Sequence, residues 1–215
     1  MAAIDHLVLA CPHLEEGVDW MAEQTGTRAV PGGRHVGVGT HNALLSFDET
    51  TYFEIIGIDE SQPAPNQPRP FGLDFSGDLR LVTFAVRPTD GETTESLART
   101  LADAGFDPGP VRAMSRKRPD GVEIQWQLSQ PGATQTPGPE PAVVPFLIDW
   151  GDTPSPARSA PVMGALIELC ISHPDPAARA AVAALDLGPV VTFVEGPPSL
   201  TAIVETTNGT VEIRP

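Results

Sequence analysis

Glu54 is the acidic side chain whose surroundings in the sequence most favour a chemical role. It interrupts an otherwise apolar run, residues 52–58, which has the composition of a β-strand. A carboxylate on such a strand is buried, and a buried charge needs a cationic partner or a metal ion. Pairing with an arginine, or a place on an edge strand, explains Glu54 equally well.

His6 lies in a second apolar run, residues 4–10. If this run is a strand, alternation places His6 on the same face as Ile4 and Val8. Such a histidine is either a core side chain with satisfied hydrogen bonds, or a base or metal ligand.

A glycine-rich segment, residues 32–42, ends in His41 and Asn42. It lacks the Lys-Ser/Thr ending of a phosphate-binding loop and leads into a strand-like run, so a phosphate cradle is not indicated. We expect a loop that turns sharply into the strand and presents both side chains to a site. His41 then acts as a third metal ligand or a general base, and Asn42 holds a carbonyl or hydroxyl group. The alternative is that both bond the backbone of the loop.

Arg116 and Arg118 alternate on one face of a later strand-like run, and Trp126 and Trp150 lie in the segments that follow. In so acidic a chain the arginine pair suits an anionic group of a substrate, and pairing with the protein's own carboxylates is the alternative. The two tryptophans either line an apolar pocket or pack in the core.

Charge and composition exclude several classes of function. The 215 residues include 28 acids and 13 bases, a formal net charge of −15, which leaves no basic surface for nucleic acid or anionic lipid. No apolar run is long enough to cross a membrane, we expect no secretion signal from the N-terminal residues, and the two cysteines make no disulfide framework. Motifs typical of serine hydrolases, zinc proteases and dinucleotide-binding enzymes are missing. We expect a cytoplasmic protein that binds a small molecule.

Three stretches repeat the order strand, helix, strands. Each begins with an apolar run, at residues 4–10, 81–86 and 166–171. Apolar residues at helical spacing follow, and each series ends at a glycine: Gly26, Gly105 and Gly188. Further strand-like runs then appear at residues 41–47, 52–58, 111–117, 122–128, 143–148, 201–206 and 210–214.

These repeats predict an α+β protein built from βαβββ modules. We expect modules at residues 1–60, 80–150 and 161–215, joined by proline-rich linkers at 61–79 and 151–160, in one compact unit.

The segments at residues 4–9, 32–35, 39–45 and 52–56 resemble the glyoxalase-like branch of the vicinal oxygen chelate superfamily, as do residues 114–121 and 145–151. The resemblance spans about residues 4–213 and implies curled mixed sheets that form a cup, with helices on the outer face. In this superfamily each module typically offers one metal ligand from its first strand and one glutamate from its fourth.

The resemblance implies a divalent metal ion (zinc, manganese, iron, nickel or magnesium) held by His6 and Glu54. The second module departs from the pattern, because Thr83 stands in the place of His6 and no acid matches Glu54. In the third module Glu168 and Glu212 occupy the matching places, and they complete the site if the first and third modules share a cup. Otherwise they are solvent-facing acids.

Such a site implies an enzyme that polarises a carbonyl of a small vicinal-oxygen substrate and moves a proton on the adjacent carbon. This would be a lyase or isomerase with His41 and Glu54 as catalytic residues; dioxygen cleavage is less favoured, because only His41 offers a second histidine. The alternative is a metal-free protein of the same fold that binds and sequesters a small molecule. The sequence leaves open whether the chain is an enzyme, and a homodimer is a further expectation.

Overall fold

The computed structural model describes residues 1–74, 77, 79–117, 123–129 and 140–214. The first half of this region contains β1 (Ala2–Ala10), α1 (Leu14–Thr25), β2 (Val30–His35), β3 (Thr40–Ser46), β4 (Tyr52–Ile58), η1 (Pro70–Gly72), β5 (Arg80–Pro88) and α2 (Thr94–Asp103). The second half contains β6 (Val111–Lys117), β7 (Glu123–Ser129), β8 (Phe146–Asp149), η2 (Pro156–Ser159), β9 (Ala165–Ser172), α3 (Pro176–Ala184), β10 (Val191–Val194), β11 (Ser199–Thr206) and β12 (Gly209–Ile213).

Local sequence signals explain the helix ends. Gly26 closes α1 in the left-handed conformation that glycine adopts without a steric penalty, with φ of 76°. Thr93 and Ser96 form a reciprocal capping box at the start of α2. The Asp175 side chain accepts a hydrogen bond from the Ala177 backbone N–H at the start of α3, as the sequence predicts. That helix ends at Ala184, before the expected stop at Gly188.

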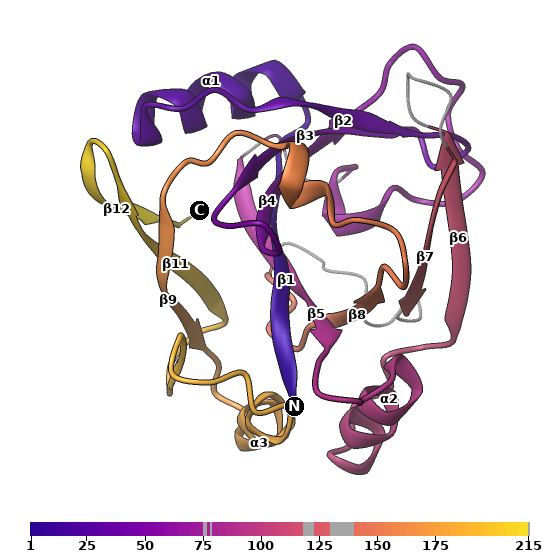
Figure 1. The fold of residues 1–215 in the computed structure, drawn as a ribbon, viewed down its shortest axis with the longest axis vertical. Coiled ribbons are helices and arrows are strands. Elements are labelled where there is room, and N and C mark those ends of the chain that lie inside the picture. The colour runs from indigo at the N-terminus through magenta and orange to yellow at the C-terminus, as the bar shows by residue number, and fades with distance from the viewer. Residues whose placement is uncertain (75–76, 78, 118–122, 130–139, 215) are drawn as a thin grey trace.

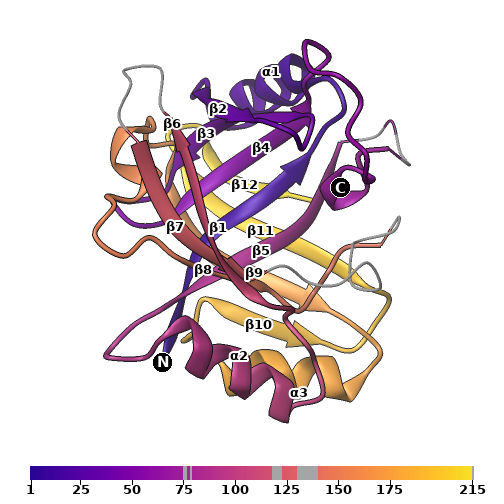
Figure 2. The ribbon, with the colours of Figure 1, turned by 90° about the vertical axis from the view of Figure 1, so that its right-hand side faces the viewer.

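Eight strands form one curled sheet in the order β2-β3-β4-β1-β5-β8-β7-β6. β1 pairs in parallel with β4 and antiparallel with β5, and β5 pairs in parallel with β8. Figures 1 and 2 show how this sheet bends into a half-barrel, and α1 and α2 pack against its outer face. This is the expected cup of a glyoxalase-like α+β fold. Residues 32–35, expected to be part of a loop, belong instead to the edge strand β2.

A second sheet has the strand order β10-β9-β11-β12. Here β9 pairs in parallel with β10 and antiparallel with β11. In the large sheet, by contrast, the first strand of each repeat pairs with the fourth. The C-terminal repeat therefore has the βαβββ order along the chain but a different order of strands in space.

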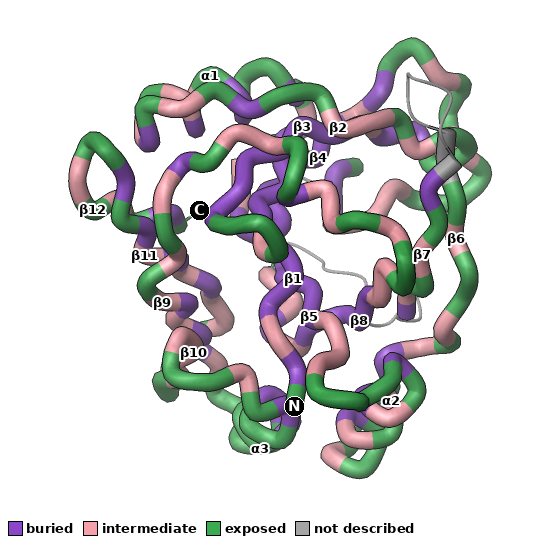
Figure 3. Tube along the Cα trace, in the orientation of Figure 1, coloured by how far each residue is buried: buried purple, intermediate pink, exposed green. Residues whose placement is uncertain are grey.

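The large sheet buries both of its faces. On the convex face, Leu7 and Leu9 join one core cluster with α1, α2, α3 and the inner face of the second sheet. On the concave face, a separate apolar cluster contains Val8, Ala85 and Phe146. In Figure 3 the buried part of the trace runs along the central strands of the large sheet. Within the described residues, no helix is long and apolar enough to span a membrane.

Candidate functional site

A β-bulge in β1 brings two neighbouring polar side chains together. In the ladder with β5, Ile4 pairs with Val86 and His6 pairs with Ala85, so Asp5 is the extra residue. A bulge interrupts the strict alternation of side chains and redirects them. Ile4 consequently joins the convex core, whereas His6 lies opposite Ala85 of the concave cluster. The sequence expectation that His6 shares a face with Ile4 was therefore wrong, while the expectation for Val8 was correct.

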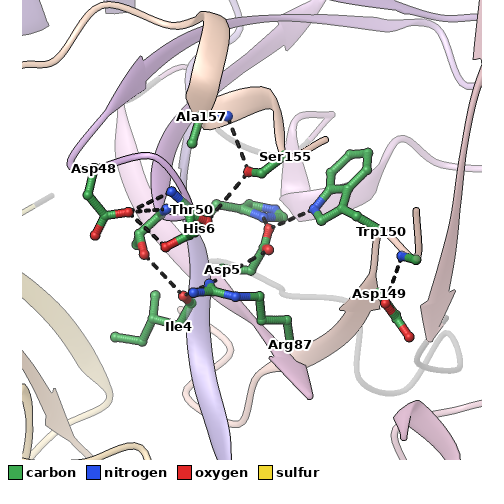
Figure 4. Close-up of polar contacts among 12 residues, drawn as sticks. Ile4, Asp5, His6, Asp48, Thr50, Arg87, Asp149, Trp150, Ser155 and Ala157 are labelled. Carbon is green, nitrogen blue, oxygen red and sulfur yellow. Dashed lines mark hydrogen bonds and ion pairs between the residues drawn. The ribbon is translucent and has the colours of Figure 1, made fainter. Parts of the chain in front are cut away.

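His6 lies between two carboxylates. Its Nδ1 is 2.7 Å from Asp5 Oδ1, and its Nε2 is 3.7 Å from Glu54 Oε2. Asp5 is fully buried, His6 is 3 % exposed and Glu54 is 8 % exposed. Figure 4 shows the Asp5 carboxylate between the imidazole of His6 and the guanidinium of Arg87. The first-strand histidine and the fourth-strand glutamate thus meet on the concave face.

Asn42 holds the second oxygen of Glu54. On β3, Asn42 pairs with Ile56 and lies diagonally beside Glu54, and its Nδ2 donates a hydrogen bond of 2.5 Å to Glu54 Oε1. Asn42 Oδ1 is buried and has no hydrogen-bond partner among the residues that the structure describes. A methyl group on Gly32 of β2 would collide with this oxygen, so the glycine makes room for the amide. Asn42 therefore orients Glu54 with its Oε2 toward His6.

Aromatic side chains enclose the His6 ring. Tyr52 stacks on it with ring centroids 4.5 Å apart and an interplanar angle of 21°, and Phe146 meets it edge-on at 5.4 Å. The indole N–H of Trp150 donates a hydrogen bond of 3.3 Å to Asp5 Oδ1. These contacts fix the ring and the carboxylate in an apolar setting, where an electrostatic interaction is stronger than in water.

The segment after β4, which we call the strap (residues 59–74), is hydrogen-bonded to β2 through Arg34 and to the β2–β3 turn through Gly39. Asp59 is buried and accepts hydrogen bonds from the Ser61 hydroxyl, from Gln62 Nε2 at 2.8 Å and from Arg34 Nε at 2.7 Å. These donors, the Ser61 hydroxyl foremost, hold the pKa of the Asp59 carboxyl far below its usual range, against the opposing effect of desolvation. Farther along, Phe71 lies 6.2 Å from Phe146, between ring centroids.

The structure separates several residues that the sequence analysis grouped. His41 follows Thr40 on the regular strand β3, and alternation points it away from the face that carries Asn42. Arg116 pairs through its backbone with Ile124, but its side chain and all of Arg118 lie outside the described residues. Trp126 and Trp150 do pack together, with ring centroids 5.5 Å apart, beside the concave cluster.

Glu168 and Glu212 do not join His6 and Glu54, because both belong to the second sheet. Glu168 accepts a hydrogen bond of 2.5 Å from the Thr192 hydroxyl. Glu212 is exposed and lies 3.3 Å from Arg214. The four-ligand site expected from the alignment of the first and third repeats therefore does not form, because the two repeats do not share a sheet.

The donor set at His6 does not fit a tightly held divalent ion. His6 and Glu54 are close enough to contact one ion, but structural and catalytic zinc sites have at least three protein ligands. Among the described side chains, no group of three or more His, Cys, Asp or Glu residues is placed to hold a metal.

Asp5, Tyr52 and Phe146 were not identified as site residues from the sequence. Asp5 directly precedes His6, and strict alternation would put their side chains on opposite faces. A second charged residue in an apolar strand was the available signal, but only the register with β5 reveals the bulge. Tyr52 could have been found, because it shares a face with Glu54 on β4.

Similarity to known proteins extends over most of the chain. A family model described as a glyoxalase-like domain matches residues 4–186. A structure described as a hypothetical protein from Staphylococcus aureus has 14 % identity and a TM-score of 0.57, covering 100 % of this chain and 86 % of that one. That similarity shows a shared fold.

Two epimerase structures align less closely. A methylmalonyl-CoA epimerase from Mycobacterium tuberculosis has 17 % identity and a TM-score of 0.40, covering 68 % of this chain and 85 % of that one. A methylmalonyl-CoA epimerase in complex with methylmalonyl-CoA and NH4+ has 17 % identity and a TM-score of 0.43, covering 73 % and 99 %. No protein of curated function matches the chain.

Proposed function

The chain belongs to the glyoxalase-like domain family, and on that premise we propose that it is an enzyme that moves a proton on a small oxygenated substrate held beside His6. The observation that carries the proposal is the row Asp5–His6–Glu54, in which one imidazole lies between two buried carboxylates. Such a row supplies a base, a group that orients it and a second carboxylate beside it.

Asp5 is the positioning residue of this row. An ionised carboxylate only accepts hydrogen bonds, so the 2.7 Å contact requires the proton of neutral His6 to be on Nδ1. The lone pair then lies on Nε2, the nitrogen that faces Glu54. The Trp150 indole N–H also donates to Asp5 Oδ1, which keeps the carboxylate in place. His6 is thereby prepared to accept a proton at Nε2.

The proton is taken from a carbon next to a carbonyl group of the substrate. The C–H bond breaks, its electron pair moves toward the carbonyl oxygen as an enolate, and the proton binds Nε2 of His6. The imidazolium ion that results lies between the carboxylates of Asp5 and Glu54, which stabilise its positive charge. Return of the proton to a neighbouring atom completes an isomerisation; loss of a leaving group completes an elimination.

The test is isotope exchange at carbon. Small 2-hydroxy ketones and 2-oxo aldehydes are incubated with the protein in D2O, and deuterium next to the carbonyl is followed by proton NMR. We expect His6→Gln to reduce any exchange that the protein catalyses by about 100-fold or more, the typical contribution of a general base. His41→Gln is the matched control and should retain the exchange, because His41 points away from the face of Asn42.

Two results would contradict the proposal: no exchange with any of these compounds, or equal exchange in the His6→Gln variant and the unchanged protein. A drop in the His41→Gln variant alone would assign the chemistry to the other face of β3.

A second candidate is a binding protein that holds a small molecule without reaction. The observation that favours it is the aromatic enclosure of His6, in which Tyr52 and Phe146 pack against the ring and leave it 3 % exposed. In the same NMR experiment this candidate predicts line broadening of the added compound that depends on His6, with no deuterium incorporation.

A further inference from the structure

The two halves of the large sheet are related by a local two-fold axis. The strands β1 to β4 are strands one to four of the first repeat, and β5 to β8 are strands one to four of the second. In these terms the strand order of the sheet is 2-3-4-1-1-4-3-2, which is the same when read from either edge. The first strands, β1 and β5, run antiparallel at the centre, and the pair Leu7–Phe84 lies at the axis. Each half therefore provides a position equivalent to every position of the other half.

The two central strands carry equivalent bulges. The pair Ile4–Val86 is matched across the axis by Leu9–Leu81, and the pair His6–Ala85 is matched by Val8–Thr83. The extra residue is Asp5 in β1 and Val82 in β5. The axis therefore places Val82 and Thr83 where the first half has Asp5 and His6.

The outer strands extend this equivalence. Val8 pairs with Glu54 on β4, and its counterpart Ala85 pairs with Phe146 on β8, so Phe146 is equivalent to Glu54. One strand farther out, Asn42 pairs with Ile56 and Leu128 pairs with Ile148, which makes Leu128 equivalent to Asn42.

Four polar residues of the first half are thus equivalent to four mostly apolar residues of the second half. Where one half has Asp5, His6, Asn42 and Glu54, the other has Val82, Thr83, Leu128 and Phe146. Both sets lie on the concave face, because Thr83 is opposite Val8, and Val82 and Phe146 belong to the concave cluster. The Phe146 ring even contacts the His6 ring, at 5.4 Å between centroids.

We infer that the cup contains one half of a two-fold symmetric metal site, and that Thr83 and Phe146 occupy the two ligand positions of the other half. With His6 and Glu54 as the only ligands that the described part of the chain offers, the protein holds no divalent ion tightly. Replacing the two occupants by ligands, as Thr83→His with Phe146→Glu, completes a four-ligand site of two histidines and two glutamates. This inference concerns ion binding and stands apart from proton transfer by His6.

The experiment measures Co²⁺ and Zn²⁺ binding to untagged, metal-stripped protein. Co²⁺ absorption and elemental analysis give the affinity and the number of ions per chain, and circular dichroism checks folding. We expect weak binding by the unchanged protein and about one ion per chain in Thr83→His/Phe146→Glu, with binding more than about 100-fold tighter, since even a residue that only orients a ligand contributes 10–100-fold.

The matched control is Thr83→His/Ile148→Glu. Ile148 is on the same strand and in the same concave cluster as Phe146, but its counterpart across the axis is Ile56 and not Glu54. This control adds the same two types of side chain, but it puts the glutamate at a position that the symmetry does not place beside His6. It should therefore not gain the tight site. Adding His6→Ala to Thr83→His/Phe146→Glu should abolish the gain.

The inference is wrong if the unchanged protein retains about one ion per chain that His6→Ala removes. It is equally wrong if folded Thr83→His/Phe146→Glu binds no better than the Ile148 control. Should the double variant fail to fold, Thr83→His alone supplies a third ligand without a new buried carboxylate. It should then tighten Co²⁺ binding by about 10-fold or more, and no gain would overturn the inference.

Discussion

Asn42 lies between Gly32 of the edge strand β2 and Glu54 of β4. The amide donates to Glu54 at 2.5 Å, while its oxygen lies against the backbone of Gly32. Gly32 has no left-handed φ, so space for the amide, rather than backbone conformation, requires glycine there. The orientation of Glu54 thus depends on Gly32, because a larger residue there would displace the Asn42 amide.

Gly32→Ala should therefore displace the Asn42 amide and release Glu54. The new methyl group overlaps Asn42 Oδ1, and the amide must turn to relieve the overlap. We expect a loss of unfolding free energy of about 1–3 kcal/mol, typical of overpacking. In ¹⁵N–¹H NMR spectra, the Asn42 side-chain amide signals should shift and its protons should exchange faster with solvent.

Gly77→Ala is the control for this substitution. Gly77 has no left-handed φ, and among the described residues no atom lies within 4 Å of the place that an added methyl group would take. The change should therefore alter the unfolding free energy by less than about 1 kcal/mol. Unchanged Asn42 amide signals in Gly32→Ala would show that the glycine does not position the amide.

Among the elements, the strands of the large sheet could be predicted more completely than the contacts between them. Apolar runs predicted β1, β4, β6 and β7 within about two residues of their observed bounds. Alternation on β1 also put His6 on the face of Val8. Local pattern was sufficient for Val8 because the bulge at Asp5 comes before His6, and the strand alternates normally from His6 to Val8.

Two features of the elements could not be obtained from local pattern. The bulge at Asp5 depends on the register between β1 and β5, which residues distant in the sequence determine. The separation of Glu168 and Glu212 from the cup depends on the assignment of strands to sheets. The weak strand β10 was also missed, because its four residues carry no alternation long enough to detect.

The strap should make stability depend on pH through Asp59. Hydrogen bonds lower the pKa of this carboxyl in the folded protein, whereas the unfolded value is about 3.9. A depressed folded pKa contributes stability above the unfolded pKa, and this contribution is lost as the pH falls below it. Asp59→Asn should thus destabilise the protein at pH 7, and the difference from the unchanged protein should shrink toward about pH 2.

The measurement is urea unfolding, followed by circular dichroism, at a series of pH values. Glu60→Gln is the control: it neutralises an exposed neighbouring acid and should leave the pH dependence unchanged. A difference between Asp59→Asn and the unchanged protein that stays constant with pH would refute the assignment.

On the scale of the molecule, the second sheet completes the core that supports the cup. Leu169 and Ile171 of β9 belong to the same buried cluster as Leu7 and Leu9 of β1. Leu169→Ala should therefore reduce the unfolding free energy by about 2–5 kcal/mol. Because the cluster is shared, circular dichroism and tryptophan emission should report one transition, shifted together to lower urea.

Ile167→Ala tests whether burial causes this effect. Ile167 lies on the same strand but is 54 % exposed, so its loss should cost less than about 0.5 kcal/mol. Two separate transitions in Leu169→Ala, with the tryptophan signal unaffected, would show that the second sheet unfolds independently.

The local two-fold axis has an evolutionary consequence because both halves lie in one polypeptide. In a homodimer of one half, a single mutation would appear on both sides of the cup, and the two sides would remain identical. Within one gene, each half accepts substitutions independently. The half that contains His6 can keep its polar side chains while the half that contains Phe146 changes, so the two walls of the cup can diverge in chemistry and shape.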